Sequence, residues 1–166
     1  MHIVPQPLEN ALAAKYRQVR SGLAVGFASQ AAMERLRSVA GGVWMASANG
    51  EELPFEDGQF EVVVLDPGSV TREMVREANR VLTAGGSLFF MVNEKTRSVE
   101  GYTAPEVYRL VREGFDILSV ARPRWWQFGA ARTLTVCARK KAWREHRSLA
   151  RDGVYIFEPF AKFANK

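Results

Sequence analysis

Residues 49–93 read NGEELPFEDGQFEVVVLDPGSVTREMVREANRVLTAGGSLFFMVN, and this stretch decides the fold. Two apolar runs, 60–65 and 88–92, enclose an amphipathic segment, 71–82. Nearly continuous Val, Leu and Phe are typical of strands that helices cover on both faces, because neither face meets water. The stretch therefore predicts a strand, a helix and a second strand parallel to the first, joined by a right-handed crossover.

The segment between the two runs carries one apolar stripe at the helical period. The stripe consists of Met74, Val75, Ala78, Val81 and Leu82. Two glycines, Gly85 and Gly86, follow the stripe. We expect them to end the helix, because glycine adopts the left-handed conformation without a steric penalty.

The same stretch resembles a known family. An Asp-Ala-Glu-x-Leu-Pro-Phe turn, a Phe-Asp-Val-Val strand and a Glu-x-x-Arg-Val-Leu-x-Pro-Gly-Gly segment are typical of class I S-adenosylmethionine-dependent methyltransferases of the small-molecule (type 11) branch. The matching stretches here are 51–55 (EELPF), 60–63 (FEVV) and 77–86 (EANRVLTAGG). The resemblance implies a doubly wound α/β fold, Rossmann-like, with a mostly parallel sheet and an antiparallel C-terminal hairpin.

The rest of the chain supplies the other elements of such a fold. Strands are expected at 2–4, 23–27, 43–46, 115–121 and 133–138. The last two should pair antiparallel, because their connection is too short for a crossover helix. Helices are expected at 8–19, at 30–39 with Ser29 as its cap, and at 103–114 with a capping box of Thr103 and Glu106. The order of elements extends the resemblance from about residue 3 to 140.

Composition indicates one globular domain with a basic tail. Of 166 residues, 47% are hydrophobic and 25% are charged. Residues 139–166 hold eight lysines and arginines against three acidic residues, which accounts for the whole net charge of +5. We therefore divide the chain into a methyltransferase-like domain, 1–138, and a basic and aromatic C-terminal extension, 139–166. The extension can meet RNA or an acidic protein surface, or form a solvated helix face.

Several classes of protein are disfavoured by the sequence. No stretch approaches the ~20 apolar residues of a membrane span, and the N-terminus has no signal-peptide pattern, so we expect a cytoplasmic protein without membrane contact. The one cysteine, Cys137, and the two distant histidines offer no metal-binding spacing, so no metal site is expected. Cys137 is expected to pack in the core.

Three positions at which the family holds S-adenosylmethionine are altered here. The resemblance implies a Gly-x-Gly-x-Gly loop after the first strand, where residues 4–10 read VPQPLEN and contain no glycine. It implies an acidic ribose ligand at the end of the second strand, where residues 26–29 read GFAS and Ala28 replaces the acid after Gly26. The aspartate that accepts from the adenine amino group corresponds to Asn49, which can still accept a hydrogen bond, although Asn49 and Gly50 are equally a common turn pair.

The loss of two contacts worth about 1.5 to 3 kcal/mol each would weaken cofactor binding by about two to four orders of magnitude. We therefore predict a methyltransferase-like pseudoenzyme without a cofactor, which acts as a binding or regulatory module. The alternative is an active S-adenosylmethionine-dependent methyltransferase of a small molecule with an atypical cofactor site. In that alternative Asp66, which follows the strand 60–65, lies near the methyl group as a base; Asp66 can equally cap the next helix.

Aromatic and cationic residues alternate in the connection between the last two strands. Trp125, Trp126 and Phe128 stand beside Arg124. Such interleaving can stack nucleic-acid bases or bind a protein surface, and tryptophans can equally fold back on a sheet edge. We take these four residues as the candidate partner-binding site. A protein is the expected partner, and RNA is a second candidate through the basic extension.

Overall fold

The computed structural model describes residues 4–27, 29–48, 52–97, 99–122 and 132–141. Six strands in these residues form one mixed sheet in the order β2-β1-β3-β4-β6-β5. In chain order the elements are α1 (Gln6–Lys15), β1 (Ser21–Val25), α2 (Gln30–Ala40), β2 (Val43–Ser47), β3 (Phe60–Leu65), the short 3₁₀ helix η1 (Pro67–Ser69), α3 (Arg72–Val81), β4 (Leu82–Asn93), α4 (Ala104–Val111), β5 (Phe115–Ala121) and β6 (Thr133–Lys140).

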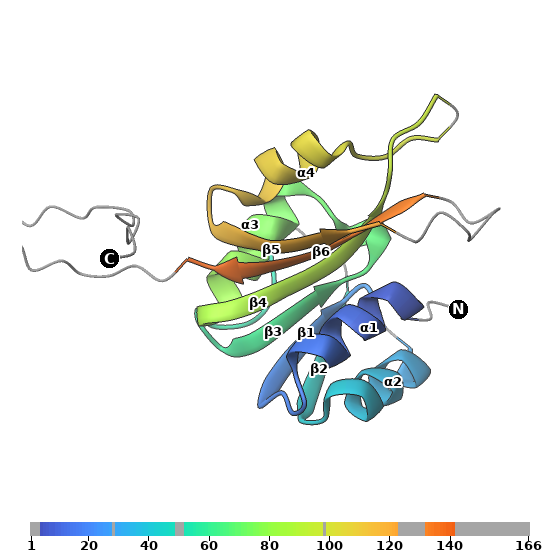
Figure 1. Cartoon of the computed structure of the whole chain (residues 1–166). Helices are drawn as coiled ribbons and strands as arrows, with labels where there is room; N and C mark the ends of the chain where they lie inside the picture. Colours follow the sequence, from blue (N-terminus) through green and yellow to red (C-terminus); the bar gives the residue numbers. More distant parts are fainter. Residues whose placement is uncertain (1–3, 28, 49–51, 98, 123–131, 142–166) are drawn as a thin grey trace, which may run out of the picture.

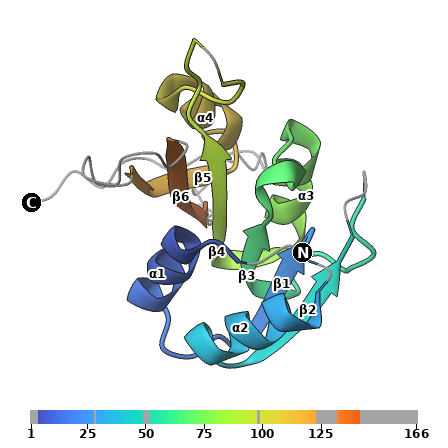
Figure 2. The same ribbon diagram turned by 90° about the vertical axis from the view of Figure 1, so that its right-hand side faces the viewer.

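Helices cover both faces of the sheet. Helices α1 and α2 lie on one face, and α3 and α4 lie on the other (Figure 1 and Figure 2). Strands β1 to β4 are parallel, β6 is antiparallel to β4, and β5 is antiparallel to β6. The predicted doubly wound α/β fold with an antiparallel C-terminal hairpin is therefore confirmed.

The stretch that decides the fold forms the predicted strand, helix and strand. Strand β3 has the predicted bounds, and the Thr71 hydroxyl caps α3 by accepting from the Met74 N–H at 3.1 Å. The helix ends before the glycines, because Leu82 is already extended and pairs with Phe60 of β3. Gly85, with φ of 74°, therefore lies inside β4, where the register with β3 shifts, and does not end the helix.

The N-terminal elements differ from the sequence interpretation. Val4 lies in no strand, so the strand expected at 2–4 is not found at its one described residue. Strand β1 is the first that the structure describes, and it pairs with β2 on one side and β3 on the other. Helix α1 ends at Lys15 and not at Val19, because Val19 already approaches the sheet and donates its N–H to the Ala40 carbonyl at 2.8 Å.

Local signals at the other helix starts are confirmed. The Ser29 hydroxyl accepts from the Ala32 N–H at 3.2 Å and caps α2. The Thr103 hydroxyl accepts from the Glu106 N–H, and the Glu106 carboxylate accepts from the Thr103 N–H at 2.7 Å, so α4 begins with the predicted capping box. None of the helices in the described ranges has the length and apolar character needed to cross a membrane.

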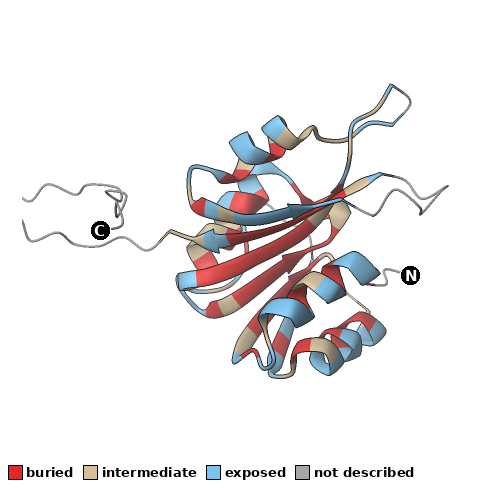
Figure 3. Cartoon of the chain, in the orientation of Figure 1, coloured by how far each residue is buried: buried red, intermediate tan, exposed pale blue. Residues whose placement is uncertain are grey.

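Buried residues concentrate on the strands (Figure 3). Neighbouring residues on β4 face opposite sides: Phe89 packs with the α1 and α2 cluster, and Phe90 packs with the α3 and α4 cluster. Both are fully buried, as expected for a strand covered on both faces. Cys137 of β6 is 5% exposed, so its predicted packing in the core is confirmed.

The last strand extends beyond the boundary expected at residue 138. Arg139 pairs with Ser87 of β4, and the Lys140 ammonium donates to the Leu82 carbonyl at 2.6 Å. These two residues, assigned to the C-terminal extension, therefore belong to the sheet, because Arg139 continues the β4 ladder and Lys140 pairs with Phe115 of β5. Residues 142–166 of the extension lie outside the described residues.

Candidate functional site

The sheet order reverses between β1 and β3. From β1 the chain continues to β2 on one side, while β3 joins β1 on the other side. Helix α2, which follows β1, and helix α3, which follows β3, lie on opposite faces (Figure 2). In open α/β sheets ligands bind outside the carboxyl ends of the strands at such a reversal. We therefore build the candidate site from the residues that follow β1, β2, β3 and β4.

The loop after β1 begins with a glycine in a left-handed conformation. Gly26 has φ of 84°, which a residue with a side chain rarely adopts. Its N–H donates to the Ser47 carbonyl at the end of β2, at 2.9 Å, and so already has a partner within the sheet. Phe27 is fully buried on the α1 and α2 side. The predicted position Ala28 lies outside the described residues.

The place of β1 in the sheet corrects the assignment of the family's cofactor loop. Residues 4–10 cannot be the loop after a first strand, because most of them belong to helix α1. Residues 26–30, which are the loop after β1 and the first residue of α2, read GFASQ, so they have the first glycine of a Gly-x-Gly-x-Gly pattern and neither of the others. The ribose position, expected at Ala28, is not among the described residues and stays a prediction.

The chain after β2 is held by helix α3. The predicted adenine positions, Asn49 and Gly50, lie outside the described residues and stay predictions. Just beyond them the Glu77 carboxylate accepts from the Leu53 N–H at 2.9 Å, and the Arg80 guanidinium donates to the Leu53 carbonyl at 2.9 Å. Hydrogen bonds from Arg80 lower the pKa of Glu77. From the sequence, Glu77 and Arg80 were known only as two residues of the family pattern in 77–86, and their contacts with Leu53 were not predicted.

Asp66, the candidate base, caps a local turn. Its carboxylate accepts from the Gly68 N–H at 3.1 Å at the start of η1, and the residue is 9% exposed. Its backbone N–H donates to the Val25 carbonyl at 2.9 Å, which ties the end of β3 to β1. The capping role is therefore confirmed for η1, whereas α3 is capped by Thr71. The role of Asp66 as a base stays a prediction.

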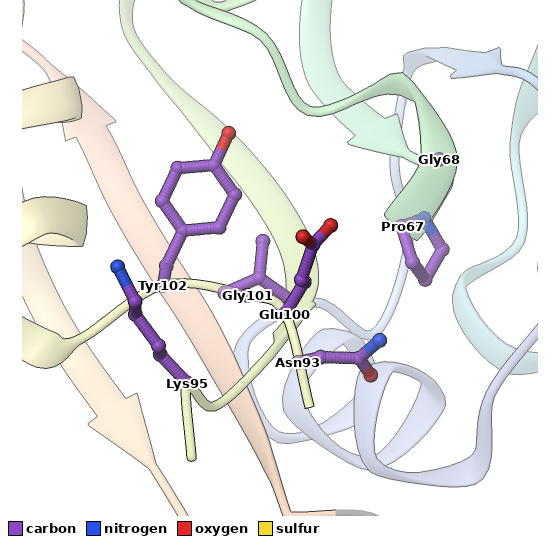
Figure 4. Close-up of a pocket in the computed structure, with 8 residues that line it drawn as sticks. Pro67, Gly68, Asn93, Lys95, Glu100, Gly101 and Tyr102 are labelled. Carbon is purple, nitrogen blue, oxygen red and sulfur yellow. The ribbon is translucent and has the colours of Figure 1, made fainter. Parts of the chain in front are cut away.

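A pocket of about 570 Å³ opens at the carboxyl ends of β3 and β4 (Figure 4). Its polar lining comes mainly from the loop after β4, which contributes the cation Lys95 and the carboxylate Glu100 to the pocket. The residues that line it include Pro67, Gly68, Asn93, Lys95, Glu100 and Tyr102. Residues 93–101 carry no motif, and their position directly after the apolar run 88–92 was the one signal in the sequence.

Backbone and side-chain hydrogen bonds hold the loop between β4 and α4 that lines the pocket, which we call the pocket loop. The Tyr102 N–H donates to the Asn93 carbonyl at 2.8 Å, and the Lys95 N–H donates to the Tyr102 carbonyl at 3.1 Å. The Tyr102 hydroxyl donates to the Val70 carbonyl at 3.0 Å, which links the loop to the chain after β3. A Cβ at Gly101 would lie 2.2 Å from the Asn93 carbonyl oxygen, so this close approach requires glycine.

A second polar cluster ties α1 to the sheet near the opposite ends of the parallel strands. The fully buried Ser87 hydroxyl accepts from the Lys15 ammonium at 2.6 Å and from the Tyr16 hydroxyl at 2.8 Å. Burial lowers the pKa of Lys15 and raises the pKa of the Cys137 thiol. These contacts link α1 to β4.

Across the described ranges, no three His, Cys, Asp or Glu side chains are grouped to hold a metal ion.

The predicted partner-binding residues, Arg124, Trp125, Trp126 and Phe128, lie outside the described residues. The adjoining chain is anchored beside the pocket loop, since the Arg122 guanidinium pairs with the Glu94 carboxylate at 2.9 Å.

Comparison with solved structures shows that the fold is that of class I S-adenosylmethionine-dependent methyltransferases. A 1,6-didemethyltoxoflavin-N1-methyltransferase from Burkholderia thailandensis is 16% identical, with a TM-score of 0.65 over 82% of this chain and 77% of that chain. A complex of the Haloferax volcanii Trm112 methyltransferase activator with a putative methyltransferase matches at 14% identity, with a TM-score of 0.64 over 82% of this chain and 90% of that chain.

A third similar structure has a different named activity. The [4+2]-cyclase SpnF is 15% identical, with a TM-score of 0.59 over 82% of this chain and 80% of that chain. No protein-family model matches the sequence, and no curated protein matches it either. At these identities the likeness establishes the fold alone, and the function has to be argued from the site.

Proposed function

We propose that this chain is a methyltransferase-fold protein with a decayed S-adenosylmethionine site, and that it works as a non-catalytic binding or regulatory module. The observation that carries the proposal is the loop after β1. Of a Gly-x-Gly-x-Gly pattern it retains Gly26, while alanine and glutamine occupy the other two glycine positions. The N–H of Gly26 is already bonded to Ser47. Close approach of a cofactor to this backbone is therefore disfavoured.

The end of β3 supports the same proposal. A base needs a carboxylate that can reach the reacting group, and the carboxylate of Asp66 is nearly buried and accepts from the Gly68 N–H. We infer that Asp66 serves the turn and not proton transfer.

The partner in this proposal is a protein, in a cytoplasmic setting. One similar structure is a complex of a methyltransferase activator with a putative methyltransferase, which supports a protein partner for this fold. Arg124, Trp125, Trp126 and Phe128 remain the proposed contact residues. RNA is the second proposed partner, through the basic extension.

The alternative, an active methyltransferase of a small molecule, is favoured by the pocket beside β3 and β4. Its volume of about 570 Å³ is in the range of small-molecule sites, and Lys95 and Glu100 bring opposite charges to it. A similar structure is named for methylation of a small molecule, 1,6-didemethyltoxoflavin. In this alternative S-adenosylmethionine is the cofactor, and Asn49 accepts from its adenine amino group.

Calorimetric titration of the full chain with S-adenosylmethionine and S-adenosylhomocysteine separates the two proposals. We expect millimolar or weaker binding, measured at protein concentrations that can detect it. Micromolar binding that is lost in Asn49→Ala would contradict the decayed site and establish the alternative. A matched control is Asn79→Ala, because Asn79 lies on α3 and its amide donates to the Gly114 carbonyl, away from the candidate site.

The RNA contact is tested by binding of a fluorescent single-stranded RNA at increasing salt concentration. Phosphate contacts release counterions, so the affinity should fall steeply with salt. The comparison is a chain that ends at Lys141, which retains all of β6. Equal binding by the two chains, or binding that is flat with salt, would rule out the extension as an RNA contact.

A further inference from the structure

Strand β2 forms an unprotected edge of the sheet. In the part of the chain that the structure describes it pairs with β1 alone, in regular register from Val43 to Ser47. Its sequence, VWMAS, contains no charge and no proline. Natural edge strands usually carry a charge, a proline or a bulge, because their free N–H and C=O groups would otherwise pair with another strand. Strand β2 has none of these protections.

The opposite edge is different. Strand β5 contains Asp116, and its register with β6 shifts between Ile117 and Ser119. A charge and an irregularity both discourage pairing by a further strand. We therefore treat β2 as the open edge and β5 as the protected edge.

One face of β2 is covered at Trp44, and the opposite face is open. Trp44 is 3% exposed, lies against Gly22 and donates its indole N–H to the Gly41 carbonyl at 2.7 Å. Val43 and Met45, which point to the other face, are 68% and 41% exposed. A further strand with apolar side chains would cover this face and pair with the edge.

Strand β6 carries the chain to the end of the sheet at which β2 begins. One row of paired residues crosses the sheet through Arg139, Ser87, Val62, Gly22 and Trp44. Four strand spacings separate the first from the last, about 19 Å in all. The C-terminal extension therefore leaves the sheet level with the start of β2.

The extension contains a segment of suitable length and composition. Residues 154–158 read VYIFE and precede Pro159. Val, Tyr, Ile and Phe favour strands, and a proline ends ladder pairing. The five residues equal the length of β2. The preceding residues 142–153 can span about 40 Å, which exceeds the distance to be crossed.

We propose that residues 154–158 of the same chain pair with β2 as a seventh strand. Because the extension leaves the sheet level with the start of β2, the shortest connection makes the added strand parallel to β2. Tyr155 and Phe157 lie on one face of it, and Val154 and Ile156 lie on the other. Whichever of these two faces of the added strand lies on the side of Val43 and Met45, it places apolar side chains beside them. The proposal does not depend on whether a cofactor binds.

Amide hydrogen exchange of the full chain tests this pairing. We expect slow exchange of the amides in 43–47 in the natural chain. The double variant Tyr155→Asp/Phe157→Asp should exchange about ten-fold faster there, because it places two carboxylates on one of the two apolar faces of the added strand. Met45→Lys should also speed exchange of the amides in 43–47, because it introduces a charge on β2 itself at an exposed edge position. Unchanged exchange of 60–65 in these variants shows that the fold is intact.

Leu118→Lys is the matched control, because Leu118 is 44% exposed on the opposite edge, and it should leave exchange of 43–47 unchanged. Three outcomes would overturn the proposal. In the first, residues 43–47 exchange at the same rate in the double variant and in the natural chain. In the second, the double variant changes exchange at 115–121 instead, which would assign the extension to β5. In the third, protection of 43–47 survives in the double variant and rises with protein concentration, which would assign β2 to a contact with a second copy.

Discussion

The Arg80 guanidinium donates two hydrogen bonds to the Glu77 carboxylate one turn earlier on α3, at 3.0 and 2.8 Å. Arg80 also donates to the carbonyls of Leu53 and Phe55, at 2.9 and 2.8 Å, and to the Asp57 carboxylate at 2.8 Å. Charge-assisted bonds of this kind are among the stronger ones in proteins. The two residues therefore hold the chain between β2 and β3 against α3, next to the candidate site.

Arg80→Ala is expected to lower the free energy of unfolding by about 1–3 kcal/mol, because it leaves two carbonyls and two carboxylates without this donor. Urea denaturation gives the value. Arg76→Ala is the control, since Arg76 is 63% exposed and makes one 3.8 Å ion pair with Glu113. That change should stay within about 0.5 kcal/mol. Equal effects of the two substitutions would contradict the role of Arg80.

Acid stability should depend on Glu77. Hydrogen bonds from Arg80 and from the Leu53 N–H lower the pKa of Glu77 below its ordinary value of 4.5. At a pH between the pKa of Glu77 in the folded chain and its pKa in the unfolded chain, Glu77 binds more protons in the unfolded chain. The stabilisation by Glu77 is therefore present above about pH 4.5 and is lost as the pH falls through the pKa of the folded chain. In Glu77→Gln the melting temperature should therefore fall less between about pH 5 and pH 3.

Glu73→Gln is the control for this pH series, because Glu73 is an exposed carboxylate on the same helix. It should reproduce the acid dependence of the natural chain. If the melting temperatures of the natural chain and of Glu77→Gln fall in parallel with pH, Glu77 does not contribute to the acid dependence of stability.

Gly101→Ala should disturb the pocket loop. The added Cβ would lie 2.2 Å from the Asn93 carbonyl oxygen, so the backbone has to shift. We expect a loss of about 1–3 kcal/mol in the free energy of unfolding, with amide chemical shift changes concentrated in 93–102. Val99→Ala, at an exposed position in the same loop, should change stability by less than about 0.5 kcal/mol. Equal stability of the two variants would contradict the close approach.

Asp66 can be tested for its two roles separately. Asp66→Ala removes the cap of η1 and should cost about 0.5–2 kcal/mol, whereas Asp66→Asn keeps an acceptor for the Gly68 N–H and should cost less. Thermal unfolding measures both. If the chain is an active methyltransferase, Asp66→Asn would retain stability and lose turnover, and that result would overturn the purely structural role.

The candidate site was harder to predict than the elements around it. Lys95, Glu100 and Tyr102 belong to no motif, and the strand order brings them to Pro67 and Gly68. The short apolar run at 2–4 predicts a first strand, whereas Val4 lies in no strand and β1 is the first strand that the structure describes. A run of three apolar residues has no local feature that distinguishes a strand from the entry to a helix.

The sequence by itself determined the elements whose signals are local. The continuous apolar run 60–65 became β3, and the caps at Ser29 and Thr103 formed as predicted, because each depends on residues within one turn or one strand. Together with the family pattern, these signals were enough for the fold class.

Only the tertiary structure decided how the strands are ordered in the sheet. Strand β1 (Ser21–Val25) sits between β2 and β3, β4 begins at Leu82, and β6 continues to Lys140. These features depend on pairing between residues far apart in the chain, and local propensity does not encode such pairing. That pairing placed Gly26 at the reversal of the sheet, put β2 at an edge of the six described strands and brought the pocket residues together.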